Sequence, residues 1–180
     1  MKKLIKRREI PAGNPVSDNT LLDRLYRSRH IKNSQELDRT LQSMLNPNQL
    51  YGIQQAVNLL VDAYQQKQKI VIVGDFDADG ATSTALSVLA LCMLGFTDVE
   101  YLVPNRFEQG YGLSVPVAEM AMEKGVQLLM TVDNGVSSFE GVAYLKEQDV
   151  KVLITDHHLP PEILPNADAI VNPNLQQCDF

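Results

Sequence analysis

Residues 69–86 read KIVIVGDFDADGATSTAL, a short β-branched run followed by three aspartates at alternate positions. The apolar run predicts a strand that is covered on both faces of a sheet, and the residues after the aspartates predict a helix. Asp75, Asp77 and Asp79 would then lie together where the strand passes into the helix. Because like charges at this distance repel and destabilise the fold, their spacing needs a physical explanation.

The same alternation of strand and helix continues to the end of the chain. Further strands are expected at DVEYLVP, VQLLMTV, KVLIT and DAIVNP. One helix between them should start near Ser114 and end at Gly125. Another has Ser137 as its predicted N-cap, with Glu140 in capping-box register. Strict alternation predicts an α/β fold with a parallel five-stranded sheet and right-handed crossover helices, and sites in such sheets form beyond the carboxyl ends of the strands.

The residues before Lys69 follow a different pattern. Residues 1–18 carry dense basic charge with little periodicity and predict a basic flexible arm. Residues 19–68 predict an N-terminal helical segment that packs on the core, followed by the α/β domain at 69–180. Three helices are expected in that segment, over residues 20–30, 33–45 and about 49–66, the second with Asn33 as N-cap and the third after a break at Pro47.

Composition limits the class of protein. The 180 residues are 44% hydrophobic with a formal net charge of −6, typical of a globular chain without the basic excess that tight, sequence-independent nucleic-acid binding needs. We find no secretory signal pattern and no run of about 20 apolar residues, so a cytoplasmic location and no membrane contact are expected. Cys92 and Cys178 match neither a disulfide framework nor a metal-binding spacing.

Acidic and imidazole side chains follow three of the predicted strands. They are Asp75, Asp77 and Asp79 after the first, Asp133 after the third, and Asp156, His157 and His158 after the fourth. Turn and cap chemistry explains one aspartate in each loop but not seven such groups at one edge of a sheet. A divalent cation would remove the repulsion, and oxygen ligands with one or two imidazoles suit Mn²⁺ or Mg²⁺.

Other interpretations of DFDADG fit less well. A calcium loop would need a glutamate at its twelfth position, which is Leu86, and a helix in front of it. A phosphatase that forms an aspartyl phosphate would use one aspartate as nucleophile and would need a later lysine and a paired-acid loop, rather than two adjacent histidines. Aspartates that serve only as turn residues are the third alternative.

Four segments, in this order and at this spacing, resemble the DHH phosphoesterase superfamily: VGDFDADGATSTAL, VPNRFEQGYGLS, TVDNGVSS and TDHHLP. The second segment favours the RecJ family of single-strand-specific exonucleases over the pyrophosphatases and small phosphodiesterases of the superfamily. The similarity runs from about Leu22 to the last residue. It implies a hydrolase that removes nucleotides from the 5′ end of single-stranded DNA in repair and recombination, with two Mn²⁺ or Mg²⁺ ions at its site.

The resemblance also implies roles for individual residues. Metal ligands are expected at Asp75, Asp77, Asp79, Asp133 and His157, with Asp133 bridging the two ions and Asp75 serving as a ligand or supporting acid. The catalytic residues would be His158, near the scissile phosphate, and Asp156, which orients the imidazoles. Arg106 is expected to hold a phosphate and Tyr111 to stack on a base.

Two departures from the family pattern qualify this expectation. Val73 stands where many members have a histidine, so the first metal site is expected either to be weaker or to rely on Asp75. The family places a further metal-binding aspartate and a DNA-closing domain downstream, so the chain is expected to be a truncated portion with little activity alone. Expected partners are single-stranded DNA and a single-strand-binding protein or helicase. Alternatives are a DHH phosphodiesterase of oligonucleotides or dinucleotides, and a non-catalytic DHH-like binding scaffold.

Overall fold

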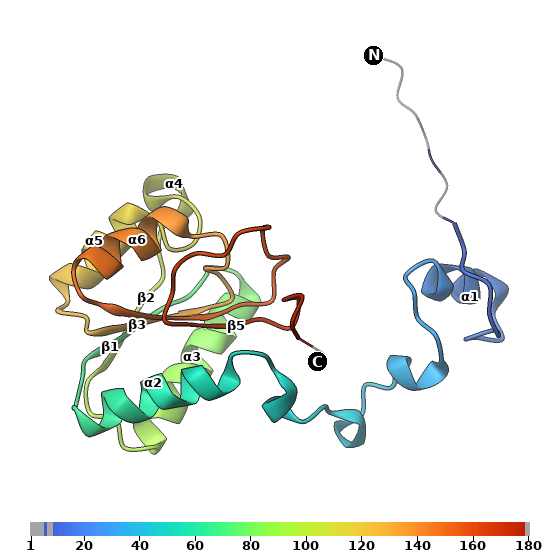
Figure 1. Ribbon diagram of the computed structural model, residues 1–180, viewed down its shortest axis with the longest axis horizontal. Coiled ribbons are helices and arrows are strands. Elements are labelled where there is room, and N and C mark those ends of the chain that lie inside the picture. Colours follow the sequence, from blue (N-terminus) through green and yellow to red (C-terminus); the bar gives the residue numbers. More distant parts are fainter. Residues whose placement is uncertain (1–5, 7–8, 179–180) are drawn as a thin grey trace, which may run out of the picture. The chain divides into compact units, whose positions relative to one another are not determined.

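The computed structural model describes residue 6 and residues 9–178 (Figure 1). The chain divides into two compact units, Met1–Leu45 and Asn46–Phe180, whereas the sequence predicted a boundary after residue 68. The expected basic arm at residues 1–18 lies partly outside the described residues, which omit 1–5 and 7–8. The helical segment expected at residues 19–68 is therefore shared between the two units.

Helix α1 (Thr20–Arg27) is the main element of the N-terminal unit. The Asn19 side chain caps it by accepting hydrogen bonds from the Leu21 and Leu22 N–H groups at 3.0 and 3.1 Å, as expected for asparagine at an N-cap. The Asp23 carboxylate accepts from the N–H of Val16 at 2.7 Å. These bonds fix the helix and the chain that precedes it by local contacts, because no residue of α1 is buried.

The helix expected over residues 33–45 is absent, and that prediction was wrong. Two short 3₁₀ turns take its place, η1 (Ser34–Leu37) and η2 (Leu41–Ser43). Between them, the Asp38 carboxylate accepts hydrogen bonds from the Thr40 N–H at 2.9 Å and from the Ser43 hydroxyl. Such side-chain bonds to the nearby chain compete with a continuous helix, and no buried apolar stripe is present to outweigh them.

The second unit is built around the predicted parallel sheet. Its strands are β1 (Ile70–Val73), β2 (Val99–Leu102), β3 (Leu128–Val132), β4 (Lys151–Thr155) and β5 (Ala169–Val171). Every paired neighbour runs parallel, in the spatial order β2-β1-β3-β4-β5. The five-stranded parallel α/β fold expected from the sequence is therefore confirmed.

Helices cover both faces of this sheet. They are α2 (Ile53–Gln65), which follows the 3₁₀ turn η3 (Pro47–Gln49), then α3 (Ala78–Met93), the short α4 (Arg106–Gln109), α5 (Val115–Glu123) and α6 (Phe139–Glu147). Helices α2 and α3 lie on one face, and α5 and α6 lie on the other (Figure 1). The N-cap of α6 is Ser138 rather than the predicted Ser137, and the Ser138 hydroxyl accepts from the N–H of Leu113 at 3.2 Å.

The strands separate two apolar layers. Val71 and Val73 of β1 face the layer formed with α5 and α6, while Ile70 and Ile72 face the layer formed with α2 and α3. All four side chains are fully buried, so both faces of β1 are covered. This explains why the strand reads as a continuous apolar run and not as an alternating one. No helix in the described part of the chain is long and apolar enough to cross a membrane.

The strand order creates a topological switch point between β1 and β3, at the carboxyl ends of the strands. From β1 the chain passes to β2 on one side, and it then returns to form β3 on the other side of β1. The loops that follow β1 and β3 therefore leave in opposite directions. In open parallel sheets, ligands bind at such a switch point, beyond the carboxyl ends of the strands.

Helix α6 packs closely on the loop that contains Leu113, and Gly141 lies at the point of contact. A Cβ atom at this position would lie 2.1 Å from the Leu113 carbonyl oxygen. Glycine to alanine in an open helix gains about 1 kcal/mol. Here we expect Gly141→Ala to lower the free energy of unfolding by about 1–3 kcal/mol, because the backbone must move apart. Urea denaturation followed by circular dichroism measures the change.

The matched control is Glu147→Ala, at an exposed position of the same helix. It should change the free energy of unfolding by no more than about 0.5 kcal/mol. Equal stability of Gly141→Ala and the parent chain would contradict the close approach of α6 to Leu113.

Candidate active site

The loop after β1 places two carboxylates, those of Asp77 and Asp79, at the start of α3. Asp77 is the N-cap of α3, and its Oδ1 accepts from the N–H of Gly80 at 3.1 Å. This hydrogen bond lowers the pKa of the Asp77 carboxyl. Asp79 follows in the first helical turn, with an exposed side chain. Gly80 is required here, because a Cβ atom would lie 2.5 Å from the carbonyl oxygen of Asp75.

Asp133 lies directly after β3 in a left-handed conformation, with φ of 61°. Asn134 holds this bend in place, because its amide donates to the carbonyl oxygens of Val73 at 3.1 Å and Val132 at 2.9 Å. The Asp133 side chain is mostly buried. Burial raises the pKa of the Asp133 carboxyl, and the negative charge of Asp79 raises it further. The fold therefore holds the Asp133 carboxyl in an environment that disfavours its charged form.

Asp156, after β4, is a buried acceptor for the chain that carries the two histidines. Its Oδ1 accepts from the N–H groups of His157 at 2.7 Å and His158 at 3.0 Å, and lies 2.7 Å from His158 Nδ1. Its Oδ2 accepts from the N–H of Val136 at 2.9 Å. Burial alone would raise the pKa of the Asp156 carboxyl, but these hydrogen bonds together hold it below its usual range. The bond to Asp156 in turn raises the pKa of His158.

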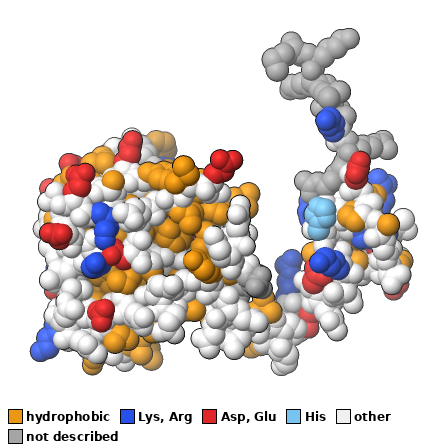
Figure 2. Space-filling model, in the orientation of Figure 1, with side chains coloured by type: hydrophobic (Ala, Val, Ile, Leu, Met, Phe, Trp, Pro, Cys, Tyr) orange, Lys and Arg blue, Asp and Glu red, His pale blue; other side chains and the backbone are white. Residues whose placement is uncertain are grey.

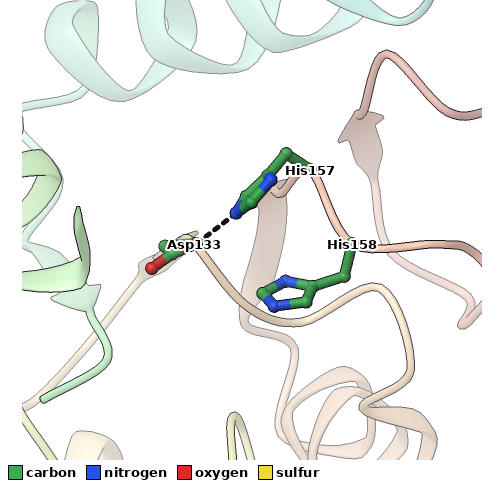
Figure 3. A group of neighbouring side chains, drawn as sticks. All are labelled: Asp133, His157 and His158. Carbon is green, nitrogen blue, oxygen red and sulfur yellow. Dashed lines mark hydrogen bonds and ion pairs between the residues drawn. The ribbon is translucent and has the colours of Figure 1, made fainter. Parts of the chain in front are cut away.

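Side chains that follow β3 and β4 meet beyond the sheet edge, where His157 points toward Asp133 (Figure 3). His157 Nε2 lies 2.8 Å from Asp133 Oδ1 and 3.9 Å from Asp79 Oδ2. Two sets of ligand atoms each lie within 4.8 Å of one another: Asp77 with Asp79 and Asp133, and Asp133 with His157 and His158. Asp133 belongs to both sets. The loops after β1, β3 and β4 thus converge on one carboxylate.

This donor set fits two divalent cations. Carboxylate oxygens with imidazole nitrogens are ligands that Mn²⁺ and Mg²⁺ accept, and a carboxylate common to two sets can bridge two ions. The raised pKa of Asp133 supports the same interpretation, since a cation beside it would favour the charged form that burial opposes. The geometry is therefore compatible with two cation sites that share Asp133.

Asp75 has a different environment from the other carboxylates of its loop. It is buried, its Oδ2 lies 2.8 Å from Arg106 Nη2, and it belongs to neither set of ligand atoms. The Arg106 guanidinium lies over the rings of Phe76, at 4.1 Å, and Tyr111, at 4.7 Å. The structure therefore places the predicted ligand Asp75 in an ion pair with the predicted phosphate-binding arginine.

The other predicted substrate residue, Tyr111, lies beside the histidines. Its hydroxyl oxygen is 3.4 Å from His158 Nε2. Two hollows flank the histidine pair. One of about 500 Å³ is lined by Tyr111, Ser114, Val136, Ser138, Asp156 and His158, among others. The second, of about 400 Å³, is more apolar and includes Leu50, Asp79, Leu86, Asp133, His157 and Val171. The site is thus open on both sides of the imidazoles.

A family model described as "DHH family, N-terminal domain" matches residues 69–179. The chain belongs to the DHH family. The match begins one residue before β1 and includes all seven of the acidic and imidazole groups at the sheet edge.

Curated relatives of this chain share one name, single-stranded-DNA-specific exonuclease RecJ. The chain is 83% identical over 180 residues to the single-stranded-DNA-specific exonuclease RecJ of Haemophilus influenzae, covering all of this chain and 31% of that protein. It is 51% identical to the Escherichia coli protein of the same name, over 98% of this chain and 31% of that protein. The chain therefore spans about a third of the length of these relatives.

Solved DHH structures agree with the fold. A crystal structure of exonuclease RecJ bound to manganese matches with a TM-score of 0.68 and 36% identity, over 76% of this chain and 34% of that chain. The RecJ structure from Thermus thermophilus in complex with Mn²⁺ matches with a TM-score of 0.65 and 31% identity, over 86% of this chain and 22% of that chain.

Two residues of this DHH site were missed by sequence reasoning. The Asn172 amide, fully buried after β5, donates to the carbonyl oxygen of His158 at 2.8 Å, and the Asn174 amide donates to the carbonyl oxygen of His157. The Asn174 N–H donates to Asn172 Oδ1 at 2.8 Å. The only signal was the segment VNPN after the last strand, which reads equally well as an ordinary turn.

Asp156→Asn should lower the pKa of His158, because a neutral amide no longer stabilises the protonated imidazole. Proton NMR titration of the His158 ring in metal-free protein measures this pKa.

Since folding raises the pKa of His158 above its ordinary value of 6.5, the ion pair with Asp156 stabilises the fold below that pH. Its contribution is lost as the pH rises through the folded pKa. Asp149→Asn, exposed and distant, should leave the titration unchanged, and an unshifted His158 in Asp156→Asn would contradict the assignment.

Asn172→Ala should weaken binding of divalent cations about 10–100-fold, because the backbone that carries both histidines loses a fixed donor. Calorimetric titration with Mn²⁺ measures the affinity, and circular dichroism reports whether the sheet is intact. Asn58→Ala, at an exposed position of α2, is the matched control and should bind Mn²⁺ as the parent does. An unchanged affinity in Asn172→Ala would show that the asparagine has no part in the site.

Proposed function

We propose that this chain is the metal-binding catalytic part of a 5′-to-3′ exonuclease that acts on single-stranded DNA in repair and recombination. The observation that carries the proposal is the pair of ligand sets that share Asp133, in a chain 83% identical to a RecJ exonuclease. The reaction is hydrolysis of a phosphodiester bond without a protein nucleophile.

Two Mn²⁺ or Mg²⁺ ions are the proposed cofactors. Asp77, Asp79 and Asp133 would hold one ion, and Asp133 with His157 would hold the other. When bound, the ions supply the positive charge that lowers the pKa of the attacking water and holds the phosphate oxygens. The manganese bound in two similar RecJ structures supports this choice. Asp75 would support the site through Arg106 rather than as a ligand.

His158 is the proposed acid of the reaction. The Asp156 carboxylate lies 2.7 Å from its Nδ1, which fixes the ring orientation and raises the pKa of His158. The ring then presents Nε2 toward the hollow that Tyr111 also lines, and the raised pKa favours its protonated form. There it can neutralise charge that develops on the phosphate or give a proton to the leaving oxygen. Asp156 itself acts through His158 as a positioning residue.

Arg106 and Tyr111 are proposed to hold the substrate. The Arg106 side chain is partly exposed, so its guanidinium can bind a phosphate while it remains over the aromatic rings. Tyr111 has a half-exposed ring on which a base can stack. Together they favour a single strand, whose bases are free to stack.

The proposed partners extend beyond the substrate. A single-strand-binding protein or a helicase is the proposed protein partner, because both produce or hold the single strands that such an enzyme consumes. The proposed location is the cytoplasm. These proposals rest on the family resemblance and on the RecJ relatives, of which this chain spans about a third.

The full-length protein that carries this chain provides the test. We expect Mn²⁺-dependent release of nucleotides from the 5′ end of a labelled single strand, no release in EDTA, and much slower cleavage of a duplex. A dinucleotide substrate distinguishes the alternative phosphodiesterase. Faster cleavage of the dinucleotide than of the long strand would overturn the exonuclease assignment, and the absence of any cleavage would favour a binding scaffold.

Asp133→Asn should reduce cleavage by about a hundredfold or more, because both ions lose their shared ligand while the bend after β3 is kept by Asn134. Initial rates over a range of Mn²⁺ concentrations measure the loss. Asp149→Asn has the same change of charge at an exposed position away from the site and should cleave as the parent does. Parent-like cleavage by Asp133→Asn would remove Asp133 from the centre.

A further inference from the structure

Charge is divided unequally between the two units of the chain. Residues 1–45 contain ten Lys and Arg against five Asp and Glu, a formal net charge of +5. Residues 46–180 contain six against seventeen, a net charge of −11. The acidic balance of the whole chain therefore belongs to the unit that carries the candidate active site, and it conceals a basic N-terminal unit.

The cations of the second unit are mostly neutralised by neighbours. Lys69 and Lys124 pair with Glu100 at 2.6 Å each. Lys146 and Lys151 pair with Asp168, at 2.6 and 3.1 Å. Arg106 pairs with Asp75, so within the described part of this unit only Lys67 forms no ion pair. Apart from Arg106, which is proposed to hold one phosphate, a polyanion that approaches this unit meets few cations that are free to bind it.

The N-terminal unit has the opposite character. Among its described cations only Arg27 is in an ion pair, with Asp23 at 3.4 Å. Its other described cations are all exposed: Lys6, Arg24, Arg29, Lys32 and Arg39. Figure 2 shows Lys and Arg side chains, in blue, at the surface of this unit. These side chains can contact phosphates without first giving up an acidic partner, so they retain the full gain from releasing counterions.

We propose that the N-terminal unit is a binding site for the sugar–phosphate backbone of single-stranded DNA, formed by Arg24, Arg29, Lys32 and Arg39. This inference rests on the proposed function. It adds that residues 1–45 supply affinity for the DNA strand. The acidic unit needs its carboxylates to hold cations, so the charge that attracts the strand lies in a separate segment. Binding through phosphates is independent of base sequence, as an exonuclease requires.

The test is binding of the whole chain to a fluorescent oligothymidylate of about 20 nucleotides, followed by anisotropy in EDTA so that no strand is cut. The test variant carries Arg24→Gln, Arg29→Gln, Lys32→Gln and Arg39→Gln together. Each lost phosphate contact should reduce the slope of log affinity against log salt concentration by about 0.7, so the slope should fall by up to about 2.8. Affinity at about 50 mM salt should fall at least about tenfold.

Two control variants separate charge in this unit from other effects. Arg24→Lys, Arg29→Lys and Arg39→Lys together keep the charge and should keep most of the affinity. Lys67→Gln with Lys151→Gln removes two exposed cations from the other unit and should leave the slope unchanged. Unaltered binding by the four-residue Gln variant, no binding by the parent chain at low salt, or equal losses in the Gln and Lys variants would overturn the proposal.

A competitor distinguishes a nucleic-acid site from a site for acidic protein. Polyglutamate of equal charge should displace the oligothymidylate much less well than an unlabelled strand does, and equal competition would overturn the proposal. Failure of the two proposals looks different. Parent-like binding by the Gln variant, together with normal Mn²⁺-dependent cleavage by the full-length protein, overturns this inference alone. Salt-dependent binding that needs these cations, without any cleavage by the full-length protein, overturns the exonuclease assignment.

Discussion

Repulsion among carboxylates at one edge of a parallel sheet is the constraint on which the site depends. The strand order brings the ends of β1, β3 and β4 side by side, and Asp133 is the group that both sets of ligand atoms share. Burial and the charge of Asp79 raise its pKa, so the fold by itself opposes the ionised form. In the function that we propose, divalent cations would relieve this repulsion, because they favour the charged form of the carboxylates.

The surrounding hydrogen bonds hold both histidines in place. Asp156 accepts from the N–H groups of both histidines and from the His158 ring, while Asn172 and Asn174 donate to their carbonyl oxygens. The backbone of the pair is therefore held from two sides by residues that follow neighbouring strands. Such support is what keeps ligands and acids at a fixed geometry while a substrate binds. Edge strand β5 has a clear part in the site because it carries these asparagines.

The two units carry opposite net charge: the unit with the candidate site is acidic and the N-terminal unit is basic. A unit that concentrates carboxylates repels polyanions, and most of its own lysines and arginines are in ion pairs within the unit. Among the described residues, the basic side chains without an ion pair lie in the N-terminal unit, apart from Lys67. If the N-terminal unit binds the strand as we propose, each unit keeps the charge that its own ligand requires. Net charge alone conceals the division.

Sequence alone determined the sheet, because buried β-branched runs have few alternatives once helices separate them. It also placed Asp77, Asp79, Asp133 and His157 at strand ends, since the topology of a parallel sheet brings such ends together. It was wrong for residues 33–45, where the local bonds of Asp38 replace a helix. Only the tertiary structure decided that Asp75 pairs with Arg106 and that Asn172 holds the histidines. Those contacts join residues far apart in the chain, and no local pattern encodes which of several similar side chains will meet.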